Sequence, residues 1–220
     1  MLKAIIFDMD GVITDTEYLD YQLQRDFIKS IASENYQLRE EDFLSLVGLS
    51  GDDLLRRIKS LSGTSLSLEE IDLSLERLSD QEYNEERIAP LFRKDILDIL
   101  DFAIENKIKL AVVSSSAMKR IRFVLESCGI LSYFNVIVSG EAFEKSKPDP
   151  QIYKHSLSEL AVKASQVLVV EDSSAGIAAA KGAGLKVIAY EENRMRIDQG
   201  QADYILKDMK EIMEKIRELV

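Results

Sequence analysis

The chain has 220 residues, of which 46% are hydrophobic and 30% charged, and its formal net charge is −11. These values are typical of a soluble globular protein that is long enough to bury a sizeable core. The acidic balance argues against nucleic acid and anionic membranes as main partners, because both need a basic surface. The single cysteine, Cys128, excludes an internal disulfide. We therefore expect a cytoplasmic protein, whose first strand begins too early to leave room for a signal peptide.

The chain opens with a short apolar run at residues 4–7 that ends in Asp8, Asp10 and Gly11. A β-branched and aromatic run bounded by a glycine is typical of a buried strand. Ligands of a parallel α/β sheet bind beyond the carboxyl ends of its strands, so both aspartates would stand at a functional edge. Two carboxylates this close repel each other, which raises the pKa of one unless a cation lies between them. Alone, the pattern would indicate only a solvated acidic turn.

The following seventy residues have the spacing of helices. Apolar positions recur on one face over residues 16–31, and the pattern returns over 40–47, 52–61 and 68–83, with glycines between the segments. This block contains no convincing strand. We therefore predict an all-helical cap domain at residues 15–89, inserted after the first strand.

Strands alternate with helices from Pro90 onward. Strands are expected at 108–113, 134–138, 167–170, 185–189 and 204–206, and helices at 94–105, 118–127, 151–160, 174–181 and 209–219. Such alternation predicts a parallel sheet covered on both faces. The expected fold class is α/β, a doubly wound parallel sheet whose Rossmann-like core comprises residues 1–14 and 90–220.

Three later stretches place polar residues beside predicted strand ends. Ser114 and Ser115 stand between a strand and a helix, where they could bind phosphate or simply cap the helix. Lys147 lies in a loop stiffened by two prolines and could contact phosphate as a point charge, although an exposed loop lysine is commoner. Glu171 and Asp172 follow another apolar strand, and helix capping would explain only one of them.

The four stretches together carry a resemblance to a known family. The segments DMDGVITDT, VVSSS, SKPDP and VVEDSSAG are similar, in this order, to the motifs of the haloacid dehalogenase superfamily in its phosphotransferase branch. The resemblance covers the whole chain, including a helical cap after the first motif. The chain looks closest to the β-phosphoglucomutase-like and sugar-phosphate phosphatase group. The first motif alone is a weak signal, whereas four motifs in order are a strong one.

The resemblance implies a nucleophile, an acid and base, and a metal. Asp8 would attack phosphorus to form an aspartyl-phosphate, and Asp10 would protonate the leaving oxygen and then activate water. Mg²⁺ would be held by Asp8, by the carbonyl of Asp10, by Asp172 and by Glu171. Magnesium suits such a site because it prefers hard oxygen ligands and retains several waters.

The remaining motif residues would bind the substrate. The resemblance assigns the phosphate oxygens to Ser114 and Lys147, with Ser115 beside them, which would stabilise the charge spread during transfer. Gly11 would let the chain turn after Asp10 toward the cap. The expected partner is a small phosphorylated metabolite, and a monomer would suit the motion that a cap requires.

Three functions stay open at this point. We prefer a Mg²⁺-dependent phosphatase acting on a sugar phosphate. A β-phosphoglucomutase-type isomerase would need a second cationic phosphate site on the cap, but Leu19 and Asp20 stand where that group usually has histidine, and Arg77 is the nearest late cation. A phospho-acceptor or phosphate-binding module without turnover would have little use for Asp10.

Overall fold

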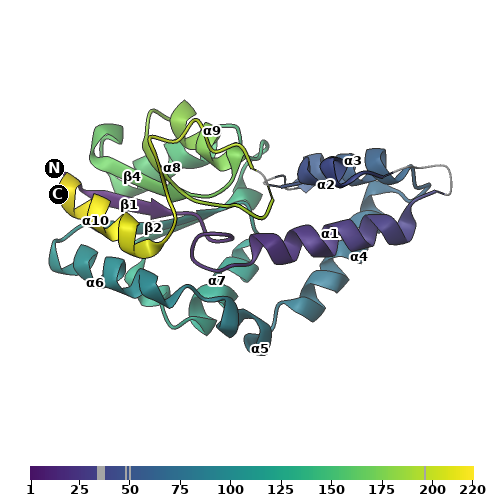
Figure 1. Cartoon of the computed structure of the whole chain (residues 1–220), viewed down its shortest axis with the longest axis horizontal. Coiled ribbons are helices and arrows are strands. Elements are labelled where there is room, and N and C mark those ends of the chain that lie inside the picture. Colours follow the sequence, from purple (N-terminus) through teal and green to yellow (C-terminus); the bar gives the residue numbers. More distant parts are fainter. Residues whose placement is uncertain (34–37, 48, 50, 196) are drawn as a thin grey trace.

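The structure, a computed structural model, describes residues 1–33, 38–47, 49, 51–195 and 197–220. Its centre is a six-stranded sheet in the order β3-β2-β1-β4-β5-β6, in which all neighbours are parallel (Figure 1). The strands are β1 (Ala4–Phe7), β2 (Lys109–Ser114), β3 (Val136–Ser139), β4 (Val167–Glu171), β5 (Lys186–Tyr190) and β6 (Tyr204–Leu206). Phe7, the last residue of β1, is paired with Val112 on one side and Val170 on the other. The first strand is therefore central rather than at an edge.

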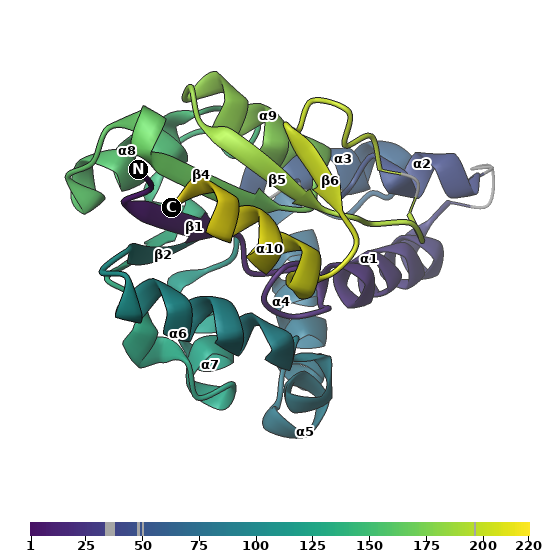
Figure 2. The same ribbon diagram turned by 60° about the vertical axis from the view of Figure 1, so that its left-hand side comes forward.

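Helices cover both faces of the sheet (Figure 2). One face packs against α6 (Leu97–Glu105), α7 (Met118–Ser127) and α10 (Met209–Leu219), and the other against α8 (Gln151–Leu160) and α9 (Ser174–Gly182). The side chains of β1 alternate between these layers, because successive residues of a strand point to opposite faces. Ile5 and Phe7 join the first layer, and Ala4 and Ile6 the second. The predicted doubly wound α/β fold is confirmed.

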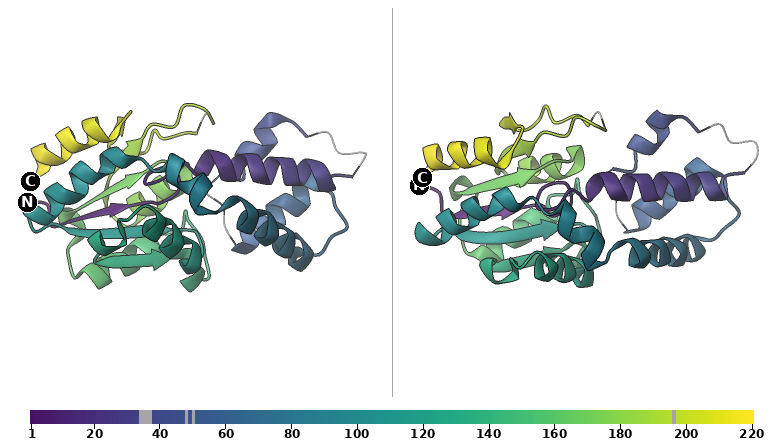
Figure 3. Two further views of the ribbon diagram at one scale, coloured as in Figure 1. Left: turned by 90° about the horizontal axis from the view of Figure 1, so that it is seen from below. Right: turned by 60° about the horizontal axis from the view of Figure 1, so that its bottom comes forward.

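Helices α1–α4 lie beyond the carboxyl end of the sheet, away from both chain termini (Figures 1 and 3). They are α1 (Glu17–Ile31), α2 (Glu40–Leu44), α3 (Gly51–Ser62) and α4 (Leu68–Glu82), and α5 (Glu85–Ile88) follows. Their apolar faces form a separate cluster that includes Phe27, Ile28, Phe43 and Ile58. This insert is helical as expected, and its limits at residues 15–89 stay a prediction.

Two chain segments connect the insert to the sheet, and they run side by side. Thr14 forms an antiparallel bridge with Phe92, and the Asp15 amide donates to the Leu91 carbonyl at 2.8 Å. The Asp15 carboxylate accepts hydrogen bonds from Arg93 at 2.8 Å and from Arg194 at 2.6 Å. Through Arg194, these contacts connect the two segments to the loop that follows β5. None of the helices in the described part of the chain is both long and apolar enough to cross a membrane.

Candidate functional site

The residues singled out from the sequence converge at the carboxyl edge of the sheet. Asp8 follows β1, Ser114 ends β2, and Glu171 ends β4, so three adjacent strands deliver them to one place. Lys147 reaches the same place from the loop before α8. All four side chains are buried. The order of the strands thus joins four motifs that are up to 163 residues apart in sequence, counted from Asp8 to Glu171.

Lys147 is the cation at the centre of the site. Its Nζ donates to Asp8 Oδ1 at 2.5 Å, to Glu171 Oε1 at 2.7 Å and to the Val113 carbonyl at 3.2 Å. Burial alone would lower the pKa of Lys147, but the Asp8 and Glu171 carboxylates outweigh it and raise this pKa well above its usual value. Lys147 therefore stays charged and links the first motif to the last.

Lys147 alone does not offset the burial of Asp8 and the negative charges around it. Burial raises the pKa of Asp8 to about 8, Lys147 opposes that rise, and Glu171 and Asp10 add to it. As the nucleophile that the resemblance implies, Asp8 would have to be ionised when it attacks. The site therefore has a use for a second cation close to Asp8.

Asp10 is held by three hydroxyl groups. Its Oδ1 accepts from Thr16 at 2.5 Å, and its Oδ2 accepts from Ser116 at 2.9 Å and from Ser114 at 3.5 Å. Thr14 in turn contacts Thr16 at 2.9 Å. These bonds fix the direction of the Asp10 carboxyl group, which lines the same cavity as Asp8.

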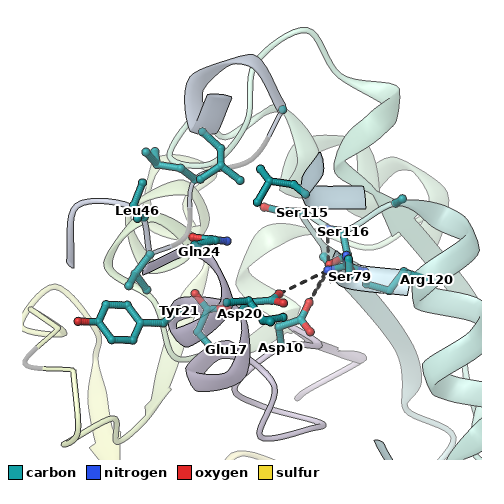
Figure 4. A pocket seen from close by; sticks show the side chains of 18 of the residues that line it. Asp10, Glu17, Asp20, Tyr21, Gln24, Leu46, Ser79, Ser115, Ser116 and Arg120 are labelled. Carbon is teal, nitrogen blue, oxygen red and sulfur yellow. Dashed lines mark hydrogen bonds and ion pairs between the residues drawn. The ribbon is translucent and has the colours of Figure 1, made fainter. Parts of the chain in front are cut away.

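The serines at the end of β2 do not cap the following helix. Helix α7 begins at Met118, whose amide donates to Glu141 Oε2 at 2.7 Å, and Ala117 at the cap position supplies no side chain for it. Ser114 Oγ instead accepts the amide of Ser116 at 3.0 Å. Ser115 lines the cavity (Figure 4). The hydroxyl groups of this turn are thus directed at Asp10 and the cavity.

Glu171 is fully buried and accepts hydrogen bonds on both oxygens. Oε1 accepts from Lys147 and, at 3.2 Å, from Tyr153, while Oε2 accepts from the amides of Asp172 and Ser173, both at 2.9 Å. In this arrangement its evident task is to hold Lys147 and the turn after β4. Its assignment as a metal ligand stays a prediction, since ligation would have to displace one of these donors.

Asp172 presents the opposite case. Its Oδ2 is buried without a hydrogen-bond partner, although burial of an unpartnered carboxylate oxygen is costly. Gly11 packs against this group: a Cβ atom at position 11 would overlap the Asp172 carboxylate, and Gly11 has a φ of +82°. An unpaired carboxylate beside Asp8 and the backbone after β1 fits a divalent cation that takes few protein ligands. No ready-made cluster of three or more acidic, histidine or cysteine ligands exists among the described residues.

The cavity above these residues has a volume of about 390 Å³ and is bounded by both the sheet edge and the insert. Glu17 and Asp20 from α1 and Ser79 from α4 line it on the insert side (Figure 4). Arg120 of α7 donates to Asp20 at 3.4 Å and to Ser79, and it stacks on the Tyr83 ring at 4.1 Å. Burial raises the pKa of Asp20 to about 6, although Arg120 opposes the rise.

Sequence reasoning missed several of these residues. Thr16 and Ser116 lie inside the quoted motifs, so a closer inspection of the hydroxyl groups near Asp10 could have found them. Arg120 and Glu17 occupy ordinary positions in helices that give no local signal. The approach of α7 to the insert brings Arg120 to the cavity, whereas Glu17 reaches it because α1 begins directly after Thr16.

We predict that Gly11→Ala loses both stability and metal binding. Alanine at a φ of +82° is strained by about 1–2 kcal/mol, and its Cβ would also overlap Asp172. Gly129→Ala is the matched control, because Gly129 has a φ of +71° and a Cβ atom at that position would meet nothing within 4 Å. Thermal unfolding and Mg²⁺ titration should show a larger loss for Gly11→Ala; equal losses would contradict the Asp172 contact.

We predict that Lys147→Met lowers the free energy of unfolding by about 3–5 kcal/mol at neutral pH, because Asp8 and Glu171 would stay buried without their cation. Lys145→Met is the control, since Lys145 is exposed two residues earlier in the same loop. Urea denaturation of both variants provides the measurement. A loss no larger than that of the control would show that Lys147 is not the counter-ion of the site.

Comparison with known proteins agrees with this geometry. A family model described as haloacid dehalogenase-like hydrolase matches residues 5–190. A phosphorylated carbohydrates phosphatase of Thermotoga maritima is 31% identical over 196 residues, which cover 85% of this chain and 84% of that protein. Protein CbbY of Cereibacter sphaeroides is 29% identical over 199 residues, covering 86% of this chain and 84% of the relative.

Solved structures show the same relationship. A β-phosphoglucomutase from Clostridium difficile superposes with a TM-score of 0.81 at 27% identity and covers 99% of this chain and 96% of its own. CbbY from Rhodobacter sphaeroides in complex with xylulose-(1,5)bisphosphate gives a TM-score of 0.76 at 26% identity, with 96% of each chain covered. The family resemblance is confirmed, and so is the expected enzyme class, a phosphoric monoester hydrolase, which the family model and the Thermotoga maritima phosphatase support. The chain belongs to the haloacid dehalogenase-like hydrolases.

Proposed function

We propose that this chain is a Mg²⁺-dependent phosphatase that hydrolyses a small sugar phosphate through an aspartyl-phosphate on Asp8. The observation that carries the proposal is that Asp8 and Asp10 line one cavity. Lys147 donates a hydrogen bond to Asp8, and the hydroxyl groups of Thr16 and Ser116 donate to Asp10. The Thermotoga maritima relative, named for phosphorylated carbohydrates, supports the substrate class. CbbY supports it as well, because its structure holds a sugar bisphosphate.

The chain's own residues divide the work between them. Asp8 would form the bond to phosphorus, and Lys147 would balance charge on Asp8 and the transferring phosphoryl group. Asp10 would give its proton to the leaving oxygen and then take one from water. Thr16 and Ser116 would keep the Asp10 carboxyl group aimed at the leaving group. Ser114 and Ser115 would contribute hydroxyl groups and amides to the phosphate.

The magnesium ion would be held by Asp8, by the carbonyl of Asp10 and by Asp172, whose unpartnered buried oxygen supports this assignment. When bound, the ion supplies charge neutralisation for the phosphoryl group as it approaches Asp8. Glu171 would act mainly through Lys147, with which it shares a 2.7 Å ion pair.

The charges around the cavity favour a phosphatase over a mutase. A mutase has to hold a bisphosphate while it turns, which requires a second cationic site on the insert. Among the described residues that line the cavity, the cations are Lys147 and Arg120, and neither comes from α1–α4. A phospho-acceptor without turnover is also disfavoured, because Asp10 is positioned with two strong hydrogen bonds for which such a module has no use.

We predict that the purified protein hydrolyses p-nitrophenyl phosphate with Mg²⁺ and that Asp8→Asn abolishes this activity, because an amide cannot serve as the nucleophile. Asp26→Asn, at an exposed position on α1, is the control and should keep full activity. Initial rates, with circular dichroism to verify folding, provide the test. Metal-dependent turnover by Asp8→Asn would exclude the aspartyl-phosphate, and inactive wild-type protein on a broad phosphate panel would favour a binding module.

We predict that Asp10→Asn slows turnover by about 10²–10⁴-fold, the usual contribution of general acid–base catalysis, while Mg²⁺ affinity stays nearly unchanged. The reason is that position 10 would bind the metal only through its carbonyl. Asp172→Asn is the matched comparison and should weaken Mg²⁺ binding, because there the carboxylate is the ligand. Calorimetric titration of both variants measures the metal affinity. A parallel fall of rate and affinity in Asp10→Asn would refute this division of roles.

A further inference from the structure

Gln199 is a buried amide residue that lies outside the four sequence motifs. It stands in the loop between β5 and β6, and it is only 5% exposed. Glutamine is mostly exposed in proteins, and a buried side-chain amide has to be satisfied by hydrogen bonds. The partners of this amide therefore indicate what the residue does here.

The side-chain amide of Gln199 joins three backbone groups. Its Nε2 donates to the Asp172 carbonyl at 2.6 Å and to the Tyr190 carbonyl at 2.7 Å. Its Oε1 accepts the Glu192 amide at 3.2 Å. Only this orientation of the side chain makes all three contacts hydrogen bonds, because carbonyls accept and N–H groups donate. Gln199 thus connects the backbone of Asp172 to the beginning of its own loop.

The backbone of Asp172 is held on both sides, whereas one oxygen of its carboxylate is not held at all. The Asp172 amide donates to Glu171 Oε2 at 2.9 Å, and the Asp172 carbonyl accepts from Gln199. The carboxylate Oδ2 has no hydrogen-bond partner, and a Cβ atom at Gly11 would overlap it. Because no donor fixes this oxygen, its position depends on the backbone that Gln199 restrains.

The loop that carries Gln199 is itself anchored at two further points. The Ser174 hydroxyl group donates to the Asp198 carbonyl at 2.5 Å, so the residue before Gln199 is bound to the start of α9. Earlier in the loop, Met195 is 2% exposed and belongs to the apolar cluster of the insert. In Figures 1 and 3 the loop extends beyond the sheet toward the insert. A donor on such an anchored loop can hold a neighbouring group in one place.

We propose that Gln199 is a positioning residue of the metal site, which keeps Asp172 in the orientation that binds Mg²⁺. It acts on the backbone of a ligand and contacts neither the ion nor the substrate. This inference rests on the assignment of Asp172 to the metal in the proposed function. Loss of a residue that orients a metal ligand typically weakens metal binding by about 10–100-fold. We expect the lower end of this range, because Gln199 holds the backbone of Asp172 and not its carboxylate.

The first test is the Mg²⁺ affinity of Gln199→Met, measured by calorimetric titration of the folded protein. Methionine is similar in length to glutamine but cannot donate to the Asp172 carbonyl. We expect the Kd for Mg²⁺ to rise about tenfold. Gln166→Met is the matched control, because Gln166 also accepts a backbone amide, that of Lys163 at 3.3 Å, but it lies before β4, at the opposite end of that strand. The Kd of this control should equal that of the wild type.

A second measurement uses the wild-type protein and does not depend on the folding of a variant. Coupling between two sites is reciprocal, so an ion on Asp172 should stabilise the contacts of Gln199 by the same factor. We therefore expect saturating Mg²⁺ to slow hydrogen exchange of the Glu192 amide about tenfold. The Gln166 amide, which donates to the Lys163 carbonyl at 2.9 Å, is the control and should exchange at an unchanged rate. Nuclear magnetic resonance resolves both amides.

Each outcome decides the proposal. An unchanged Kd in Gln199→Met would overturn it, as would an equal loss of affinity in Gln166→Met. Exchange of the Glu192 amide that does not respond to Mg²⁺ would also overturn it, and this result decides alone if Gln199→Met does not fold. Failure of the proposed function looks different: the wild-type protein would then bind no Mg²⁺ or hydrolyse no phosphate ester, and the positioning role would fall with it.

Discussion

The site depends on one buried ammonium group that has to balance several carboxylates. Lys147 contacts both Asp8 and Glu171 within 2.7 Å, and all three are almost without solvent. Buried charges persist only when they are paired and hydrogen-bonded, so this contact dictates how closely β1, β4 and the loop before α8 must approach. It leaves a deficit of positive charge, which shows in the raised pKa of Asp8 and in the unpartnered oxygen of Asp172. The same deficit supports the divalent cation that we propose for this site.

Two glycines leave room for the carboxylates of the site, because neither carries a side chain. A Cβ atom at Gly11 would overlap Asp172, and one at Gly176 would overlap Glu171. The amide of Gly176 also donates to the Ser173 hydroxyl group at 3.0 Å, so that Ser173 caps the start of α9. Helix α9 can therefore begin directly against the charged cluster. Close packing of this kind, and not the acids alone, keeps the site compact.

Much of the core could be predicted because it follows from local patterns. The helices at 118–127, 151–160 and 209–219 and the strand at 204–206 have the bounds that periodicity predicted. The insert was less predictable, since the helix expected over 40–47 ends at Leu44. In the core, the helix expected over 94–105 begins with a 3₁₀ turn. Short helices depend on tertiary packing more than on their own sequence. The donors around Glu171 and the pairing of Arg120 with Asp20, one hundred residues apart, arise only when separate elements meet.

Two groups of charged residues line the cavity, one at the edge of the sheet and one beside the insert. At the sheet edge, Asp8 and Glu171 are paired with Lys147, and Asp172 keeps an unpartnered oxygen that would suit the proposed cation. On the insert side, Asp20 is paired with Arg120, and Glu17 also lines the cavity. In the proposed phosphatase, phosphate would bind at the first set and the leaving group would face the second, so a change in the insert could alter the substrate while the sheet edge stays as it is. A fold with one reaction plan can in this way serve different metabolites, which is why the function has to be argued from the site and not from the fold.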